Sequence, residues 1–559
     1  MWRHNYEPVA GSLGASAVVA AVPVFVLFVM LGVLRKPAWM SALAALISAL
    51  LVALAIYGMP LQLAVVSTLY GAAYGLFPIA WIVFTSIMLY RLAVDTGKFE
   101  IIKDSVGSLT DDRRLQALFI AFSFGAFIEG AAGFGAPVAV AGAMLAGLGF
   151  NPFYAAGICL LANTAPVAFG SIGIPVVTLA NVTGLPIMAL SAMVGRLCAL
   201  ISVLIPAYLL VVMAGTAGAL EVLPAIVACG LSFAGVQFTV SNFVGPDLTD
   251  ILSSLTCIVV MVAVLKLWRP KRIMRLEGDR PAAVARHHSG AEVFTAWSPY
   301  LLLVIFVLAA GAPMVKNALD ARTHALLPAA WKSATVMNGL FVPGLHNLIL
   351  RIPPVTPTES PYAAVFTLNW LTASGTACFF ATIAAAAFLG VGPKRFAGIY
   401  VATFRQLSKA ILTIALMLGL AYVMNYSGMT STLGLALAAS GPAFPFFGAV
   451  VGWLGVFLTG SDTSANALFG NLQVVTANTL HLNPVLSAAV NSSAGVMGKM
   501  ISIQSIAVAV AATGMTSADE SRLFRFTVKH SVLLMATVGI IALLFAYVWP
   551  GAVPAAPPR

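Results

Sequence analysis

The sequence predicts an all-α polytopic membrane protein with about 12 transmembrane helices, plus two re-entrant hairpins in inverted repeats with broken helices. The composition is the first reason: of 559 residues, 60% are hydrophobic and only 8% are charged, and the mean hydropathy is +0.99. No soluble globular protein has so few charges to cover its surface. The second reason is that apolar runs long enough to cross a bilayer recur along the chain. The third is that polar interruptions of these runs follow the same order in both halves.

The charge pattern excludes a nucleic-acid-binding protein, although the net charge is +11. Lys and Arg lie in short gaps between apolar runs, which is typical of loops on the cytoplasmic side of a membrane. The five cysteines all fall inside apolar runs, without paired spacing or adjacent histidines. We therefore expect neither disulfides nor a metal site, and no cofactor.

The lengths of the apolar runs give the predicted spans. Arg35 and Lys36 follow the first run, so this gap is expected in the cytoplasm and the N-terminus outside. The same count places the basic loop 269–297 in the cytoplasm and both termini on the extracytoplasmic side of the membrane. The region 316–362 is expected to be an ordered extracellular excursion, with a flexible loop as the alternative. Simple spans are expected near 13–34, 39–57, 61–94, 188–214, 219–242, 248–268, 298–315, 363–391 and 410–427.

A shared order of motifs predicts two repeats in one transporter domain, about 61–268 and about 363–549. Each repeat has a glycine-rich hairpin with an acidic residue, then an Asn-Pro pair, then an apolar helix with a polar break. The number of spans before each hairpin predicts that the first hairpin opens to the cytoplasm and the second to the outside. The two repeats are therefore expected to be inverted, as in secondary transporters. Chance recurrence of turns and glycine-rich runs is the alternative. The predicted hairpins are 115–150 and 444–480, and the predicted broken helices are 152–183 and 485–515.

Two acids in the hairpins are candidates for proton coupling. Glu129 lies in an apolar stretch, where an unpaired carboxylate costs at least ~2.5 kcal/mol, so it is expected to be protonated, paired or hydrated. Asp462 lies in the second hairpin among Ser and Thr residues. For both residues the alternative role is to cap a helix of the hairpin.

Lys499 and a set of neutral side chains are candidates for substrate binding. Lys499 lies inside an apolar run without an acid of its own, so it can pair with Glu129 or Asp462, bind a substrate carboxylate, or extend to the membrane surface. The neutral groups suit a small carboxylate with a hydroxyl group, because half-helix starts bind anions through backbone amides. The predicted substrate-binding residues are Asn163, Thr164, Ser461, Thr463, Asn491, Ser492, Lys499 and Gln504.

Long strings in this chain resemble the bacterial L-lactate permease family. They include GAFIEGAAGFGAPVA, AAGICLLANTAPVAFGSIGIP, SNFVGPDLTDILSSL, GWLGVFLTGSDTSANALF and GKMISIQSIA, and the resemblance runs from WRHNYEP to the last span. It implies a secondary transporter that imports L-lactate and related 2-hydroxymonocarboxylates (glycolate, D-lactate) by proton symport. The family's hairpin sequences match at Glu129, Asn163, Asp462 and Lys499.

The resemblance also places the chain in the ion-transporter superfamily, whose dicarboxylate members hold substrate between two hairpin tips. Those relatives hold sodium with Ser-Asn-Thr tips. Here the corresponding places offer Glu129 and Ser461-Asp462-Thr463, so the expected partners are a proton gradient, a small carboxylate and the lipid bilayer, with sodium less favoured. A homo-oligomer is compatible with the sequence.

The sequence disfavours two other functions, an intramembrane hydrolase and a channel. An intramembrane hydrolase would need a Gly-x-Gly-Asp segment with a second acid or a cluster of histidines, and the chain has Thr459-Gly460-Ser461-Asp462 with no histidine pair in a span. A channel is disfavoured because two inverted hairpins suit alternating exposure of a site rather than a continuous pore. The sequence therefore predicts a transporter and not an enzyme.

Overall fold

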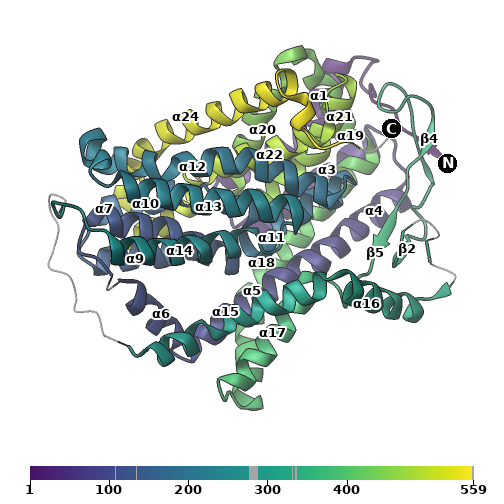
Figure 1. Cartoon of the computed structure of the whole chain (residues 1–559). Helices are drawn as coiled ribbons and strands as arrows, with labels where there is room; N and C mark the ends of the chain where they lie inside the picture. The colour runs from purple at the N-terminus through teal and green to yellow at the C-terminus, as the bar shows by residue number, and fades with distance from the viewer. Residues whose placement is uncertain (108, 134, 276–287, 330–331, 334–335, 557–559) are drawn as a thin grey trace.

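The computed structural model describes residues 1–107, 109–133, 135–275, 288–329, 332–333 and 336–556. In this part of the chain, 11 helices are long and apolar enough to cross a membrane, or up to 13 if each of two bent pairs forms one span. The predicted helical fold with about 12 spans is confirmed, and the chain is a multi-pass membrane protein. The long helices lie side by side in a block, and both termini and the short strands lie at one of its ends (Figure 1).

The first part of the chain forms long helices that pack on α18 (Pro393–Ser427) of the second half. The contact is close because Gly71 has no side chain: a Cβ there would lie 2.3 Å from the Leu418 carbonyl oxygen. The elements are β1 (Trp2–Arg3), α1 (Leu13–Ala20), α2 (Val22–Phe28), η1 (Val29–Val33), α3 (Ala38–Ala55), α4 (Leu61–Tyr74), η2 (Gly75–Ala80), α5 (Trp81–Asp95) and α6 (Lys98–Gly107).

A hairpin and a bent helix come next. The hairpin rises through a continuous helical run and returns as α9, with a left-handed Gly135 (φ 82°) directly before α9. After it, the two pieces of the broken helix meet at 62°. The elements are α7 (Arg113–Gln116), η3 (Ala117–Phe124), α8 (Gly125–Ala131), α9 (Ala136–Gly147), α10 (Pro152–Ala162), η4 (Val167–Phe169) and α11 (Gly170–Thr183).

The middle of the chain differs from the predicted bounds in two places. The helix predicted near 298–315 begins at Gly290, within the predicted loop 269–297, because Ser289 and Glu292 form a capping box. The span predicted near 363–391 is helical only from Ser374, because Val365–Thr367 pairs as a strand instead. Residues 276–287 of the predicted loop lie outside the described residues. The helices are α12 (Ile187–Leu220), α13 (Leu223–Phe243), α14 (Thr249–Leu267), α15 (Gly290–Gly311), α16 (Pro313–Leu326) and α17 (Ser374–Phe388).

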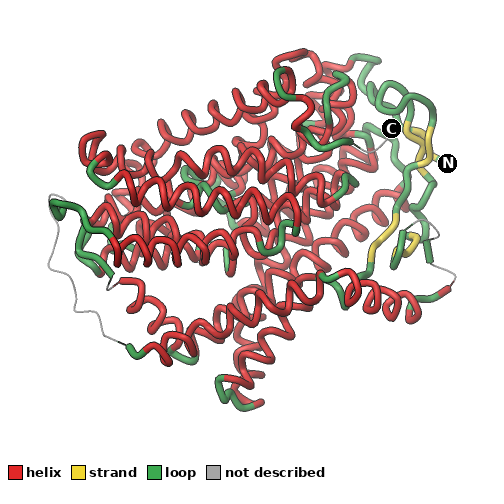
Figure 2. The backbone as a smooth tube through the Cα atoms, in the orientation of Figure 1, coloured by secondary structure: helices red, strands yellow, loops and turns green. Residues whose placement is uncertain are grey.

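The described part of the chain contains five short strands, and they lie at the end of the molecule that carries both termini (Figure 2). In one small sheet β3 pairs with β1 in parallel and with β4 antiparallel, and β2 pairs with β5 antiparallel in the other. The region predicted as an excursion at 316–362 thus contains helix and sheet. The strands after β1 are β2 (Gly339–Phe341), β3 (Ile349–Arg351), β4 (Ser360–Pro361) and β5 (Val365–Thr367).

The last part of the chain contains a second hairpin and a second bent helix. A left-handed Gly460 (φ 69°) ends the first arm of the hairpin, and the two pieces of the broken helix meet at 40°. The elements are α18 (Pro393–Ser427), α19 (Met429–Leu437), η6 (Ala438–Ala443), α20 (Phe444–Thr459), α21 (Asp462–Thr479), α22 (Pro484–Lys499), α23 (Ile503–Ala512), η7 (Ser517–Asp519), α24 (Glu520–Tyr547) and η8 (Pro550–Ala552).

The two Asn-Pro turns lie at opposite ends of α24. Each Asn caps its helix through a side-chain oxygen, and each Pro takes the first helical position. Phe153, next to the first turn, lies under Arg522 at the start of α24. Asn483 of the second turn donates to the Pro554 carbonyl oxygen beyond the end of α24. The 28 residues of α24 span about 42 Å, so the two bent helices enter the block from opposite sides.

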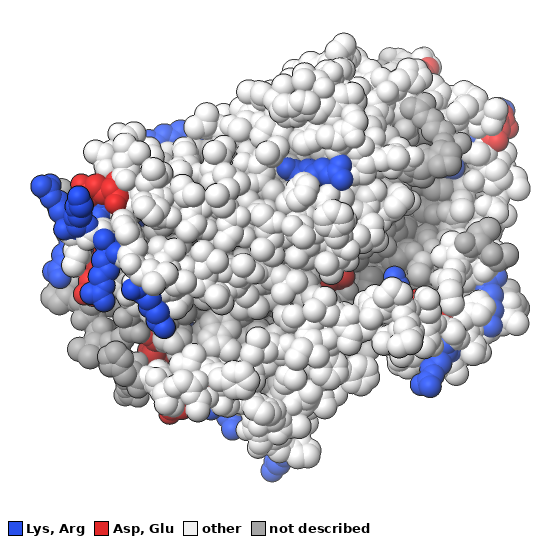
Figure 3. Space-filling model, viewed as in Figure 1, with Lys and Arg blue, Asp and Glu red and all other residues white. Residues whose placement is uncertain are grey.

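The surface fits a membrane. A broad, uncharged stretch covers most of the visible face, and Lys and Arg gather at the end of the block away from the termini (Figure 3). Large exposed hydrophobic side chains occur on many of the long helices, as expected for contact with lipid.

Candidate functional site

The tips of both hairpins and both bent helices meet at one cavity. Its volume is about 270 Å³, just below the range of ~300–1,000 Å³ typical of drug-sized ligands, so it suits a small molecule. The first half contributes Glu129, Gly135, Val167, Gly170, Ser171, Ile174 and Pro175. The second half contributes Thr459–Ser464 from the hairpin tip, and Lys499, Gln504, Ser505 and Val508 from the bent helix, with α18 and Ala38 completing the wall.

A buried ion pair joins the two halves in this cavity. Lys499 Nζ, at the end of α22, lies 2.9 Å from Glu129 Oε1, near the end of α8. Both residues are buried, and Glu129 Oε2 has no hydrogen-bond partner among the described residues. A cation at a helix C-terminus is also favoured by the helix dipole. The charge of each residue is therefore balanced by the other across the two halves of the chain.

The break between α10 and α11 is built to hold the Glu129 carboxylate. A Cβ on Gly170 would lie 2.6 Å from Glu129 Oε1, so any side chain at this position would displace the carboxylate. Ser171 follows with a left-handed backbone (φ 46°), and its Oγ donates to the Ala132 carbonyl oxygen of the first hairpin at 2.8 Å. A left-handed conformation in a non-glycine residue costs of order 1–3 kcal/mol, which the surrounding contacts must offset.

Asp462 occupies a matching place in the second half. It is the first residue of α21, after Ser461, whose Oγ accepts from the Ser464 backbone amide. Asp462 Oδ2 accepts from Ser492 Oγ at 2.5 Å, whereas Oδ1 has no partner among the described residues. A Cβ on Gly495 of α22 would lie 2.8 Å from Oδ1. In both halves a glycine of the bent helix thus leaves room for a hairpin carboxylate.

A cluster of buried amides lies behind Asp462. Asn466 Nδ2 donates to the Pro175 carbonyl oxygen and to Ser492 Oγ, each at 3.1 Å. Asn491 donates to Asn466 Oδ1 at 2.9 Å and accepts from Gln473 at 3.1 Å. These bonds tie α21 and α22 to the bent helix of the first half.

The cavity lining carries one cation, Lys499, and two acids, Glu129 and Asp462. Among the described residues, no group of three or more His, Cys, Asp or Glu side chains could hold a metal ion. The site thus offers a positive charge, two acids that can exchange protons, and the hydroxyl and amide groups of the second hairpin and its bent helix.

The sequence profile of the family described as L-lactate permease matches residues 16–549. This chain belongs to the L-lactate permease family. It is 48% identical to the L-lactate permease of Bacillus subtilis, over 99% of this chain and 100% of the relative. It is 46% identical to the glycolate permease GlcA of Escherichia coli, over 98% of this chain and 99% of the relative. The L-lactate permease family is thus a family of transporters, and the relatives are permeases rather than enzymes.

One further relative and one solved structure match most of the chain. The L-lactate permease of Escherichia coli is 44% identical over 99% of this chain and 100% of the relative. Among solved structures, the YdaH transporter of Alcanivorax borkumensis, described as having an unusual topology, matches 87% of this chain and 89% of its own, at 14% identity and a TM-score of 0.36.

The structure of this permease-family chain brings six of the ten predicted site residues to the cavity: Glu129, Ser461, Asp462, Thr463, Lys499 and Gln504. The other four lie outside the lining. Ser492 and Asn491 stand behind Asp462, where they are engaged in hydrogen bonds. Asn163 and Thr164 lie behind Lys499, in a packed contact without room for a ligand. Thr164 Oγ1 donates to the Leu161 carbonyl oxygen, so this hydroxyl serves its own helix.

The sequence analysis gave no role to Asp250, in the first turn of α14. It is 1% exposed, and neither of its carboxylate oxygens has a hydrogen-bond partner among the described residues. It lies beside the Glu129 segment, since a Cβ on Gly130 would be 2.8 Å from the Asp250 Cβ. The available signal was an acid at the start of an apolar run, which is weaker than that of Glu129, an acid inside such a run.

A second, larger cavity opens beside the central one. Its volume is about 780 Å³, and it shares Gly135 and Val508 with the central cavity. Polar groups of α5 and α18 line it: Arg395 forms an ion pair with Asp95 at 2.7 Å, and Arg91 donates to Gln406. Because Gly135 and Val508 line both spaces, the two cavities adjoin each other beside the start of α9.

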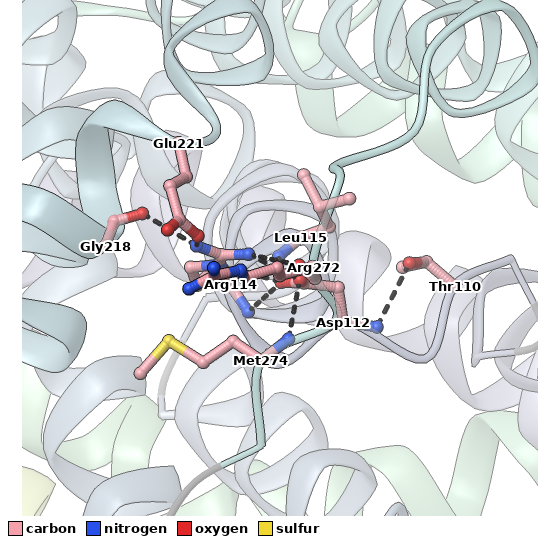
Figure 4. Close-up of polar contacts among 8 residues, drawn as sticks. All are labelled: Thr110, Asp112, Arg114, Leu115, Gly218, Glu221, Arg272 and Met274. Carbon is pink, nitrogen blue, oxygen red and sulfur yellow. Dashed lines mark hydrogen bonds and ion pairs between the residues drawn. The ribbon is translucent and has the colours of Figure 1, made fainter.

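A network of charged residues around the buried Arg114 and Asp112 lies at the base of the first hairpin (Figure 4). Arg114 Nη2 lies 2.8 Å from Asp112 Oδ2, and its Nη1 lies 2.7 Å from Glu221 Oε2 in the turn between α12 and α13. The Met274 backbone amide also donates to Asp112 Oδ2, which ties the segment after α14 to the same point. These contacts link the base of the hairpin to the turn between α12 and α13 and to the segment after α14.

Proposed function

We propose that this chain imports L-lactate and related 2-hydroxymonocarboxylates, including glycolate and D-lactate, across the bacterial inner membrane by proton symport. The names of the relatives, lactate and glycolate permeases, support the substrate class. The observation that carries the mechanism is the contact between Lys499 and Glu129, because it places the one cation of the cavity lining on an acid from the other repeat.

This contact offers a simple coupling mechanism. While Glu129 is ionised, its carboxylate holds Lys499. A proton taken up by Glu129 cancels that charge and frees Lys499 to bind the substrate carboxylate. The empty and the loaded site then carry the same net charge, so neither state leaves an unpaired charge inside the membrane. Binding of the substrate carboxylate without a proton, or of a proton without the substrate, would leave an unpaired charge inside the membrane.

The remaining lining groups fit the rest of the substrate. Ser461, Thr463 and Gln504 supply hydroxyl and amide groups around the second hairpin tip, which suit the 2-hydroxyl group. Asn491 and Ser492 position the hairpin behind Asp462, and Asn163 and Thr164 support Lys499. Asp462 and Asp250 are further acids that can take part in proton transfer.

The proposed orientation puts the basic end in the cytoplasm and both termini outside. The positive charge around the end of α14 supports it, because cytoplasmic loops carry an excess of Lys and Arg. Single cysteines at Asn151 and Asn483 should then react with an impermeant reagent from opposite sides of the membrane, and reaction from the same side would contradict the inverted arrangement.

Purified protein in vesicles tests the function. An inward lactate gradient should drive proton uptake without any imposed pH gradient, and glycolate should compete with labelled lactate. Lactate movement set by voltage alone would indicate a channel, and no movement of lactate or glycolate would contradict the proposal.

A further inference from the structure

A third cavity lies at the end of the molecule that carries both termini. Its volume is about 660 Å³, more than twice that of the central cavity. It is walled by Arg351 and Tyr362 of the sheet region, by Ser431 of α19, and by the segments at the ends of α11 and α21. Among the described residues that line it there is no Asp or Glu. Its remaining polar groups include Asn471, Asn478 and His481.

Two helices connect this cavity to the central one. The start of α11 lines the central cavity, and Thr183–Leu185 at its other end line the outer one. Likewise α21 begins at the central cavity with Asp462 and reaches the outer cavity at Asn471. At 1.5 Å per residue these stretches are roughly 12–15 Å long. Between the two cavities the helices pack tightly: a Cβ on Gly470 would lie 2.7 Å from Leu179 Cδ1.

Arg351 is the charged group of this outer cavity. Its guanidinium carbon lies 4.8 Å from the centre of the Tyr362 ring, which in turn stacks on Tyr426 at 4.3 Å. Its Nε is buried and has no hydrogen-bond partner among the described residues. Arg3, on the strand paired with that of Arg351, instead forms an ion pair with Glu359. Arg351 is thus held in place by aromatic rings while part of its donor capacity is unused.

We propose that this outer cavity is a second binding site that captures a small monocarboxylate through Arg351 before it reaches the central site. A guanidinium binds a carboxylate through paired N–H donors, and the cation–π contact fixes its plane for this geometry. The amides of Asn471 and Asn478 suit a substrate hydroxyl group. The inference deepens the proposed function and rests on it for the identity of the carboxylate.

Equilibrium binding of radiolabelled L-lactate to the purified full-length protein tests the proposal. The wild type should bind two lactates per chain. Arg351→Gln should weaken one of the two sites at least tenfold, and Arg351→Lys, which keeps the charge, should weaken it less. Asn471→Asp, nearly the same in shape but negatively charged in the cavity, should weaken the same site. Arg3→Gln removes a charge from the same sheet outside the cavity and should leave both sites intact.

Three results would overturn the proposal: one lactate per wild-type chain, two unaltered sites in Arg351→Gln, or displacement from the Arg351 site by inorganic phosphate but not by acetate, which would identify a phosphate site instead. Lys499→Gln should weaken only the other site. If wild-type vesicles fail to transport lactate while Arg351-dependent binding persists, the proposed function fails and the outer site stands.

Discussion

Lys499 Nζ lies 2.9 Å from Glu129 Oε1, although the two residues are 370 positions apart in the chain. One belongs to the hairpin of the first half and the other to the bent helix of the second. Their contact is therefore both a tie between the halves and the charged centre of the cavity. Because both residues are buried, each one compensates the charge of the other.

The pair should show strong energetic coupling. Glu129→Gln alone or Lys499→Gln alone leaves a buried charge without its partner, which should cost about 3–5 kcal/mol of stability. The double variant removes both charges and should cost less than the sum of the single changes. Thermal unfolding of the purified protein in detergent measures all four forms. Additive losses would mean that the two side chains do not interact in the membrane protein.

Gly170 should be intolerant of a side chain because of Glu129. Gly170→Ala places a Cβ 2.6 Å from Glu129 Oε1, so the carboxylate must move away from Lys499. We expect at least a tenfold loss of lactate uptake in protein that still folds. Gly235→Ala is the matched control, since a Cβ there has no atom within 4 Å. Equal uptake by both variants would show that the position of the carboxylate is not critical.

Arg114 should stabilise the base of the first hairpin. It is 1% exposed and binds Asp112, Glu221 and two backbone carbonyl oxygens. Arg114→Met leaves the buried Asp112 uncompensated and should cost about 3–5 kcal/mol, measured by thermal unfolding. Arg525→Met, at an exposed arginine whose Nε donates to the Ser521 carbonyl oxygen of its own helix, should change stability by less than about 0.5 kcal/mol. Similar losses in the two variants would contradict a special role for the network.

His4 should make the anchoring of the N-terminus depend on pH. Burial lowers the pKa of His4 from 6.5 to about 4; its hydrogen bond to the Tyr426 carbonyl oxygen raises the pKa, and Arg351 lowers it further. Between these values the unfolded chain binds the proton and the folded chain does not, so stability is full above pH 6.5 and falls as the pH drops toward 4. The loss by pH 5 should be about 2 kcal/mol. Unfolding at pH 7.5 and pH 5 should show this loss, and His4→Gln should lack the part of the pH dependence that comes from His4.

The sequence was informative about the site wherever a single residue conflicts with its surroundings. Glu129, Asp462 and Lys499 are charged residues in apolar runs, and each lines the cavity. The Asn-Pro turns were readable for a similar reason, since Asn caps a helix and Pro begins one. Each of these signals depends on a short stretch of sequence, so it can be recognised without knowledge of the tertiary fold.

Other assignments depended on partners that the sequence does not reveal. Asn491 was predicted to bind substrate at a helix break. Its side-chain amide instead forms hydrogen bonds with Asn466 and Gln473 of α21. The helix bounds near 290 and 374 were set by a capping box and by strand pairing, which hydropathy does not register. The sequence did not predict that Asp250 is buried, because this residue lies at the edge of an apolar run, where an acid usually faces water.

The most direct test of the coupling mechanism measures proton and lactate fluxes together in vesicles that contain the Glu129→Gln variant. Lactate should still exchange for lactate, while proton movement per lactate should fall at least tenfold. Asp247→Asn, a carboxylate that accepts from Ser374 at 2.7 Å outside the central cavity, should keep the wild-type ratio. A Glu129→Gln variant that moves as many protons per lactate as the wild type would contradict the account.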